Sequence, residues 1–372
     1  MLEPSRHVSL LAAAAFQVTT VAALLACERD TGETNGLRAS GPPARIEAIE
    51  AAERPDVLLV TIDTLRADHV SALGYERPTT PHFDAFARGG ALFEQAYSVT
   101  PTTLPAHAAL FTSRFATEVG VTKNGTPLPE TATTIAERLA DAGYATAGFV
   151  SSYVLDRRFG AAQGFQHYDD DFTGADSKLP QGTRWHDEPI EVTFDRRGGD
   201  TTDAALHWIA ASPQEIPLFV WVHYFDPHQP LMPREPFRSE FASGSMQQLE
   251  ILADGYDAEV RYVDEQLGRL LAGFGERAPG GRGLAVVTSD HGEGLWDHGW
   301  LTHGVNLYEE LARVPLAFRW PGRIARPLRV TAPVSLLDLA PTLYSLLGLD
   351  AASDGLRGRD LSAVLSAEVE AD

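Results

Sequence analysis

The segment that decides the fold runs from Pro55 to Asp63 and reads PDVLLVTID. Its run of aliphatic and β-branched residues is typical of a central strand that is buried on both faces. Asp63 closes the run, and open α/β sheets place their ligand sites at the carboxyl ends of their strands. The segment therefore predicts a buried parallel strand with Asp63 as a candidate site residue, although an aspartate at a strand end also serves as a plain cap.

Two further apolar runs end in polar side chains in the same way. Residues 217–223 lead into His228, and residues 284–289 lead into Asp290 and His291. Strands that alternate with helices predict βαβ units, and therefore a mostly parallel sheet that is covered by helices on both faces. The remaining expected elements are a strand over 145–150 and helices over 131–142, 202–211 and 246–274.

A hydroxyl-rich turn precedes an apolar helix at residues 100–112, which read TPTTLPAHAALFT. The pattern predicts a helix that begins near Leu104 with Pro105 in its first turn and Thr103 at the cap. Backbone N–H groups and the positive end of the helix dipole point outward there, so the Thr103 hydroxyl faces a place where an anion binds. Threonine is also an ordinary helix cap, and the segment alone does not separate the two interpretations.

The composition limits the partners of this chain. With 372 residues, 44% of them hydrophobic, the chain is long enough to bury a large core. A net charge of −21 argues against nucleic acid or an anionic membrane surface as an electrostatic partner. An acidic protein that acts on an anionic substrate has to concentrate a metal or another cation in its pocket.

The N-terminal residues are typical of an export signal. Arg6 precedes a mostly apolar run that reaches Ala26, and the sequence LLAC around Cys27 resembles a bacterial lipobox, after which Cys27 would be lipidated. A retained membrane-spanning anchor is the alternative. We therefore expect a signal peptide over 1–27, a flexible tether over 28–54 and one folded domain over 55–372. The expected location is the bacterial cell envelope, at the periplasmic face or the outer membrane, with the membrane as a partner through the lipid.

Five candidate side chains are expected to converge at one edge of the sheet. They are Asp63, Thr103, His228, Asp290 and His291. Two carboxylates, an imidazole and a hydroxyl form a suitable shell for a divalent metal. Such a metal would lower the pKa of the Thr103 hydroxyl, so that the threonine could attack an ester without a separate general base.

Longer motifs resemble the sulfatase branch of the alkaline phosphatase superfamily, between about Pro55 and Leu361. The resemblance implies an α/β fold with a central, mostly parallel sheet between helices and a smaller C-terminal sheet. It also implies hydrolysis through a covalent sulfo- or phospho-enzyme. The matching stretches are VTIDTLRADH at 60–69, PHQP at 227–230, SDHGE at 289–293, YEELARVP at 308–315 and DLAPT at 338–342.

The departures from the family pattern are informative. Sulfatases carry a Cys or Ser that is converted to formylglycine at the position of Thr103, and threonine is not converted in that way. The pattern Thr-x-Pro-x-His resembles phosphodiesterases of the same superfamily instead. In that comparison His228 and His303 are expected to contact the phosphoryl oxygens or to protonate the leaving group. His107 and Asn124 are expected to contact the substrate, although Asn124 also fits a plain turn.

The metal and the reaction follow from the same comparison. The pair Asp290 and His291 stands where calcium sulfatases commonly have Asp-Asn, and a nitrogen ligand favours manganese or zinc, with calcium possible. A second metal at His228 and His303 stays open. We expect a hydrolase of a small anionic ester, preferably a phosphodiester or phosphonate monoester, with a covalent intermediate on Thr103. The alternatives are a sulfatase without formylglycine, a phospho-headgroup transferase and a non-catalytic binding protein. The polar segment 164–200 is expected to be a surface excursion or lid.

Overall fold

The computed structural model describes residues 54–173, 177–179, 181–185, 188–278, 283–324, 327–350 and 355–366. The expected signal peptide over 1–27, with its lipidation site at Cys27, and nearly all of the tether over 28–54 lie outside the described residues. The division of the chain into these segments therefore stays a prediction. Among the described helices, none combines the length and the apolar character that crossing a bilayer requires.

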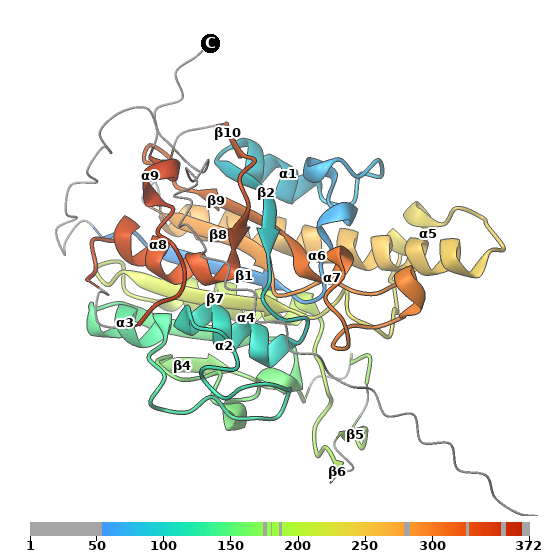
Figure 1. The fold of residues 1–372 in the computed structure, drawn as a ribbon, viewed down its shortest axis with the longest axis horizontal. Coiled ribbons are helices and arrows are strands. Elements are labelled where there is room, and N and C mark those ends of the chain that lie inside the picture. The colour runs from blue at the N-terminus through green and yellow to red at the C-terminus, as the bar shows by residue number, and fades with distance from the viewer. Residues whose placement is uncertain are drawn as a thin grey trace, which may run out of the picture. The chain divides into compact units, whose positions relative to one another are not determined.

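A central sheet of nine strands organises the described residues (Figure 1). The strands are β1 Val57–Ile62, β2 Ala91–Tyr97, β3 Ala145–Val150, β4 His167–Asp169, β7 Leu218–Tyr224, β8 Leu284–Ser289, β9 Arg313–Arg319, β10 Leu328–Val330 and β11 Val334–Ser335. Their order is β10-β2-β9-β8-β1-β7-β3-β4, and β11 also pairs with β2. Only β9 runs antiparallel to its neighbours, β2 and β8, among these described strands. The expectation of a mostly parallel central sheet is confirmed.

Helices cover both faces of this sheet, as expected. The helices are α1 Pro81–Arg88, α2 Thr103–Thr112, α3 Ile135–Asp141, α4 Gly198–Ala211, α5 Phe237–Phe241, α6 Gln248–Arg277, α7 Glu309–Ala312, α8 Leu339–Leu346 and α9 Ser362–Leu365. Short 3₁₀ turns lie at Ala67–His69, Ser71–Leu73, Tyr153–Leu155, Arg157–Phe159, Asp297–Gly299 and Leu336–Asp338. One apolar cluster joins the sheet to α2, α3, α8 and α9, and a second joins its other face to α1, α4 and α6.

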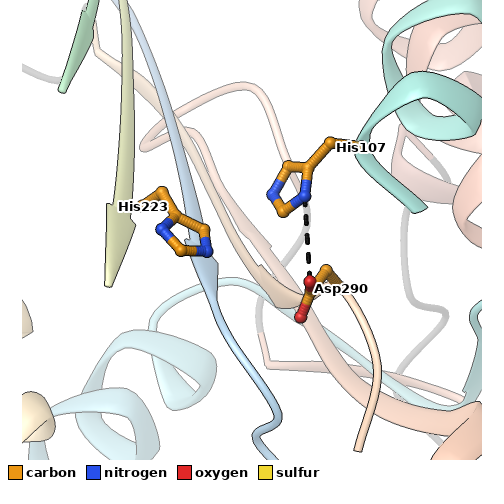
Figure 2. Close-up of side chains that lie close together, drawn as sticks. All are labelled: His107, His223 and Asp290. Atoms are coloured by element: carbon orange, nitrogen blue, oxygen red, sulfur yellow. Dashed lines mark ion pairs between the residues drawn. The ribbon is translucent and has the colours of Figure 1, made fainter. Parts of the chain in front are cut away.

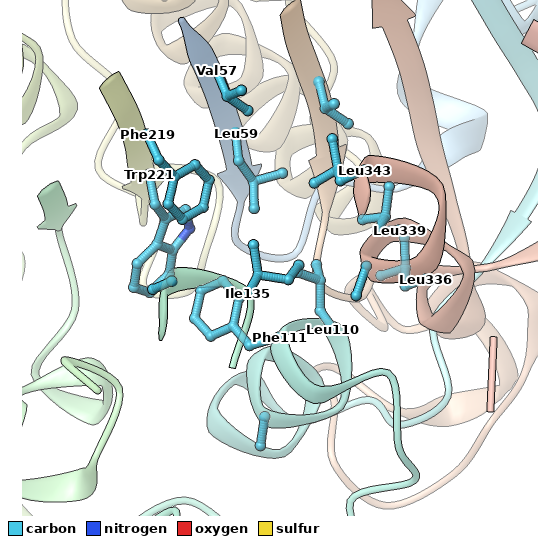
Figure 3. Close-up of a cluster of buried hydrophobic side chains, with 14 of the residues drawn as sticks. Val57, Leu59, Leu110, Phe111, Ile135, Phe219, Trp221, Leu336, Leu339 and Leu343 are labelled. Carbon is cyan, nitrogen blue, oxygen red and sulfur yellow. The ribbon is translucent and has the colours of Figure 1, made fainter. Parts of the chain in front are cut away.

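The alternation of side chains along β1 positions the site. Val57 and Leu59 belong to the apolar cluster on the α2 face (Figure 3). Leu58 and Val60 belong to the cluster on the opposite face. Because successive side chains of a strand point to opposite faces, the next residues on the α2 face are Thr61 and then the residue that follows the strand. That residue is Asp63, so the strand aims its terminal carboxylate at the N-terminus of α2.

Helix α2 begins one residue earlier than the sequence indicated. Thr102 has an extended backbone, with φ −145° and ψ 128°, and precedes the first helical residue, Thr103. The Thr102 carbonyl accepts the Ala106 N–H at 2.9 Å, but its side chain makes no capping bond. Thr103 is therefore the first residue of the helix rather than its cap, and its hydroxyl is not used to cap the helix.

The segment 164–200 is built into the fold more than expected. Strand β4 pairs with β3, and Lys178, Asp195 and Arg197 are buried. The smaller sheet also lies in this segment, where β5 Arg184–Trp185 pairs with β6 Glu188–Pro189. The C-terminal strands β10 and β11 do not form that sheet; they pair with β2 and cover the edge that it would otherwise expose.

Candidate active site

Strands β1 and β8 and helix α2 bring four sequence-predicted residues together. The Thr103 hydroxyl lies 3.5 Å from Asp63 Oδ2 and 3.3 Å from His291 Nε2. His291 Nε2 in turn lies 3.4 Å from Asp290 Oδ2 and 3.9 Å from Asp63 Oδ1. All four side chains are buried. The carboxyl ends of two parallel strands and the start of one helix thus meet at one point.

The unpaired atoms of these residues fit a divalent cation. Asp63 Oδ1 and Asp290 Oδ2 are buried and have no hydrogen-bond partner in the described part of the structure. Burial raises the pKa of Asp63 to about 7. Burial, and then the charge of Asp63, also raise the pKa of Asp290 well above its ordinary value. Two desolvated carboxylates of like charge are costly unless a cation lies between them, which is the chemistry of a metal site.

The orientation of His291 supports the same conclusion. Its Nδ1 lies 3.0 Å from the Gly292 carbonyl oxygen, which only accepts hydrogen bonds, so Nδ1 carries the hydrogen. Burial lowers the pKa of His291 well below its ordinary value, and the ring is therefore neutral. Its Nε2 lone pair then faces the Thr103 hydroxyl, which is able to donate to it, and the carboxylate oxygens of Asp63 and Asp290, which are not. A lone pair among carboxylate oxygens suits a metal ligand.

Two backbone features hold the carboxylates in place. Thr64, directly after Asp63, has a φ of 57°, a costly value for a β-branched residue. Asp290 Oδ1 accepts the Thr64 N–H at 3.3 Å, and the Tyr256 hydroxyl donates to the Thr64 carbonyl at 2.6 Å. A Cβ at Gly292 would collide with the Glu310 carbonyl, so the motif requires glycine there.

His228 and His303 lie at the opening of the site. Their ring centroids are 4.9 Å apart, and the His303 ring lies 4.4 Å from that of His291. Burial lowers the pKa of His303, but the hydrogen bond from its Nδ1 to Glu293 Oε1, at 3.2 Å, and the charge of Glu293 outweigh burial and raise it. Burial lowers the pKa of His228. The pKa values of the two imidazoles are thus shifted in opposite directions.

The sequence left open a second metal site at His228 and His303. Among the described residues, these two histidines do not belong to any group of side chains that could hold a metal ion. Within the described ranges, two such groups are found, Asp63 with Asp290 and His291, and His107 with His223 and Asp290. Neither contains His228 or His303, and the latter's Nδ1 is already bonded to Glu293.

His107 is enclosed by the protein, whereas Asn124 lies at the start of α2 and borders a cavity. His107 is buried inside α2, and both of its ring nitrogens lie within hydrogen-bond distance of protein oxygens, at Thr103 and Thr61. Asn124 Oδ1 accepts the Leu104 N–H at 2.9 Å, next to the Thr103 hydroxyl. Asn124 also borders a cavity of about 660 Å³. Aromatic and cationic side chains line this cavity, including Tyr153, Phe159, Trp185, Lys123 and Arg158.

Two residues near the site were missed at the level of sequence. His223, the sixth residue of β7, lies 3.4 Å from Asp63 Oδ2 through its Nε2. The signal was a single histidine inside an otherwise apolar strand. Lys178 belongs to the segment that had no motif, yet its ammonium group donates to the carbonyls of Asp226 and His228. Lys178 therefore holds the loop that carries His228.

The fold and the site define an α/β protein with a buried, metal-competent centre at the carboxyl edge of its sheet and the start of a helix. Residues 55–349 match the family described as Sulfatase, and the chain belongs to that family. Membership makes it a hydrolase of sulfate or phosphate esters, and enzymes of this family bind a divalent metal.

Individual relatives share about a quarter of the aligned residues with this chain. The uncharacterized sulfatase YidJ of Escherichia coli is 26% identical over 345 residues, which are 80% of this chain and 69% of the relative. The Delta 4,5-hexuronate-2-O-sulfatase of Bacteroides thetaiotaomicron is 24% identical over 340 residues, 81% of this chain and 70% of the relative. The solved phosphonate monoester hydrolase of Agrobacterium radiobacter superposes with a TM-score of 0.70 at 23% identity, and the match covers 85% of this chain and 78% of that one. That likeness shows a shared fold.

Proposed function

We propose that this chain hydrolyses a monoanionic ester of phosphorus, a phosphodiester or a phosphonate monoester, through a covalent intermediate on Thr103. The observation that carries the proposal is the position of the Thr103 hydroxyl, within 3.5 Å of two candidate metal ligands, Asp63 and His291. Because Thr103 is also the first residue of α2, the positive end of the helix dipole faces the same point. A nucleophile, a cation site and an anion-binding helix end thus coincide.

The charges of the site favour a substrate with one negative charge. Asp63, Thr103, Asp290 and His291 would hold the divalent cation, which when bound lowers the pKa of a contacting hydroxyl and attracts the ester oxygens. The two carboxylates balance the charge of that cation, and Glu293 balances the charge of protonated His303. Phosphodiesters, phosphonate monoesters and sulfate esters carry a single charge at neutral pH. Phosphate monoesters carry close to two charges, and among the described residues the groups named here supply no further cation for the second.

His228 and His303 each carry out one of the two proton transfers during the reaction. The Thr103 hydroxyl loses its proton to solvent before the reaction, which a bound cation would favour by lowering its pKa. In the first step the Thr103 oxygen forms a bond to phosphorus, the bond to the leaving oxygen breaks, and His303 Nε2 gives that oxygen its proton. Glu293 supports this role because it holds a hydrogen on Nδ1 of His303. In the second step water attacks the phosphorus and releases the Thr103 oxygen. His228 takes one proton of that water at Nε2, since its Nδ1 faces the Gln229 carbonyl. Transfer of that proton through solvent to His303, whose ring lies 4.9 Å away, restores both rings for the next cycle.

The identity of the nucleophile favours phosphorus over sulfur. Without formylglycine, the intermediate is a plain ester of threonine, which water has to cleave at the phosphorus or sulfur atom. Sulfate ester hydrolysis is nevertheless the second candidate, because the chain belongs to the Sulfatase family and the curated relatives described above are named as sulfatases. The proposed cation is manganese or zinc, because His291 offers a nitrogen ligand.

The cavity beside Asn124 supports an ester with a sizeable organic group. Its lining combines the aromatic rings of Tyr153, Phe159 and Trp185 with the cationic side chains of Lys123 and Arg158. Such a wall accepts a planar or cyclic alcohol group, and the cations favour one that carries further negative charge. The proposed substrate is a small-molecule anionic ester whose organic group occupies part of this cavity. We propose no nucleic-acid partner.

We also propose that the chain is exported and anchored to the bacterial envelope through a lipid on Cys27. The support is the LLAC sequence after an apolar run. Radiolabelled palmitate should enter the protein in growing cells, and a Cys27→Ala variant should be unlabelled and recovered in the soluble fraction.

Substitution of Thr103 tests the proposed chemistry. A Thr103→Ala variant loaded with manganese or zinc should lose at least about 10⁴-fold in kcat, because its nucleophile is removed. Thr102→Ala is the matched control, since the Thr102 side chain makes no capping bond. Specificity constants on the p-nitrophenyl esters of sulfate, phosphate, a phosphodiester and a phosphonate then rank the substrates. Undiminished turnover by Thr103→Ala contradicts the proposal, and a dominant sulfate ester activity favours the second candidate.

A further inference from the structure

Two buried histidines, His107 and His223, face each other on the inner side of the site (Figure 2). Their ring centroids lie 5.2 Å apart at an angle of 72°. Together with Asp290 they offer ligand atoms that all lie within 4.8 Å of one another. Their hydrogen bonds, however, show that the two rings are not equivalent.

Both nitrogens of His107 are used by the protein. Nδ1 donates to the Thr103 carbonyl at 2.8 Å, since a carbonyl only accepts. Nε2 lies 2.9 Å from the Thr61 hydroxyl, which itself receives the Trp221 indole N–H at 3.0 Å. Because the indole only donates, Thr61 passes its own hydrogen to His107 Nε2. His107 therefore braces the first turn of α2 and has no lone pair to offer a metal.

His223 shows the opposite pattern. Its side chain is buried, and neither ring nitrogen has a hydrogen-bond partner in the part of the chain that the structure describes. Such groups are rare in folded proteins, and each requires a reason. A merely structural histidine at this position would be expected to share the arrangement of His107, with both nitrogens bonded.

The sheet aims His223 at the metal centre. In the register of β7 with β1, His223 is the partner of Thr61, which lies two residues before Asp63 and on the same face. His223 Nε2 consequently lies 3.4 Å from Asp63 Oδ2, the oxygen atom that is also 3.5 Å from the Thr103 hydroxyl. Separations of this size fit ligand atoms that share one cation, since ligand bonds of ~2.0–2.2 Å place neighbouring ligand atoms of a five-coordinate shell roughly 3.0–3.6 Å apart.

We propose that His223 Nε2 is a fifth protein ligand of the divalent cation, beside Asp63, Thr103, Asp290 and His291, and that His107 is a positioning residue outside the metal shell. The inference rests on the metal centre of the proposed function. Two imidazole ligands, His223 and His291, make the site richer in nitrogen than the sequence alone indicated. A shell of this kind selects zinc or manganese and disfavours calcium, which prefers oxygen ligands.

Metal affinity tests this assignment without reference to turnover. The purified chain is stripped with a chelator and titrated with zinc against a chromophoric competitor. The wild-type protein should bind one equivalent, and His223→Ala should raise the dissociation constant for zinc by at least about 100-fold, the upper end of the cost of losing a supporting residue. His207→Ala, which removes an exposed histidine of α4, is the matched control and should leave the affinity unchanged.

A measurement on the unmutated protein covers the case in which His223→Ala does not fold. In the cobalt-loaded wild-type protein, proton NMR should show two paramagnetically shifted, exchangeable imidazole N–H signals, one each from His223 and His291. A single signal, or equal zinc affinity in folded His223→Ala and wild type, overturns the inference. Failure of the wild-type protein to bind any metal overturns this inference and the proposed metal centre together. Two signals without hydrolysis of any of the four test esters leave His223 as a ligand and overturn the proposed function alone.

Discussion

Two of the groups of buried carboxylates in the described part of the chain differ in the cations that they meet. In the first, which we call the paired cluster, Asp226 and Glu259 face Lys178 and Arg197. Lys178 Nζ lies 3.1 Å from Glu259 Oε1, and Arg197 Nη1 lies 3.3 Å from Glu259 Oε2 and 3.5 Å from Asp226 Oδ1. All four side chains are buried, and their charges balance within the protein.

The second group, which we call the open cluster, consists of Asp63 and Asp290. Within the ranges that the structure describes, only histidines lie within ion-pair distance of these carboxylates. Asp63 Oδ1 and Asp290 Oδ2 have no hydrogen-bond partner among the described residues. Burial of acidic side chains is therefore not by itself a sign of function. Asp226 Oδ1 likewise has no hydrogen-bond partner among the described residues, but the Arg197 guanidinium lies 3.5 Å from it. No described lysine or arginine forms such a pair with the open cluster, which is therefore the one that suits a cation from solution.

The largest effect should follow from breaking the open cluster at Asp290. An Asp290→Asn variant removes a ligand charge that no neighbouring residue replaces, so it should lose bound metal and about 10⁴-fold or more in kcat/KM. Metal content by mass spectrometry and hydrolysis of a p-nitrophenyl phosphodiester measure the two losses. Asp141→Asn, at an exposed position at the end of α3, should change neither. Full metal content in Asp290→Asn would show that the open cluster is not a metal site.

The paired cluster should respond in stability and not in metal binding. A Glu259→Gln variant leaves the buried cations Lys178 and Arg197 with a neutral partner, which should cost about 3–5 kcal/mol of unfolding free energy. Urea unfolding in the presence of a chelator and of zinc should give the same loss, because Glu259 contacts no candidate metal ligand among the described residues. Glu276→Gln, an exposed change on the same helix α6, should stay within about 0.5 kcal/mol. If Glu259→Gln lowers the unfolding free energy only in the zinc-loaded protein, then Glu259 takes part in metal binding and the two clusters are not independent.

The same comparison shows how far the sequence could predict this site. The ends of β1 and β8 were predictable because each is an apolar run followed at once by Asp63 or by Asp290 and His291, and both signals are local. The position of Thr103 was predictable because Pro105 and the apolar run after it mark the start of a helix. These signals need no knowledge of which elements become neighbours.

The residues that were missed depend on contacts across the chain. His223 is significant only because β7 pairs with β1 and turns that side chain toward Asp63 and α2, and an apolar strand alone does not indicate which face α2 covers. Lys178 contacts Glu259, 81 positions away, and nothing in the polar segment around it indicates that partner. The unequal hydrogen bonding of His107 and His223 likewise arises from tertiary neighbours such as Trp221.

The smallest expected effect is a change in unfolding free energy whose sign differs between the two clusters. In the metal-free protein, Asp63 is a desolvated carboxylate beside Asp290 and the lone pair of His291, so Asp63→Asn should relieve repulsion and raise the unfolding free energy by about 1–3 kcal/mol. With zinc present the order should reverse, because the wild-type protein gains the free energy of binding and the variant gains little. Urea unfolding of both proteins, each with chelator and with zinc, measures the reversal. No charge-neutralising change in the paired cluster should stabilise the protein under either condition, since each of its carboxylates already has a cation. If Asp63→Asn destabilises the metal-free protein as well, then Asp63 has a structural partner of its own and the contrast between the clusters fails.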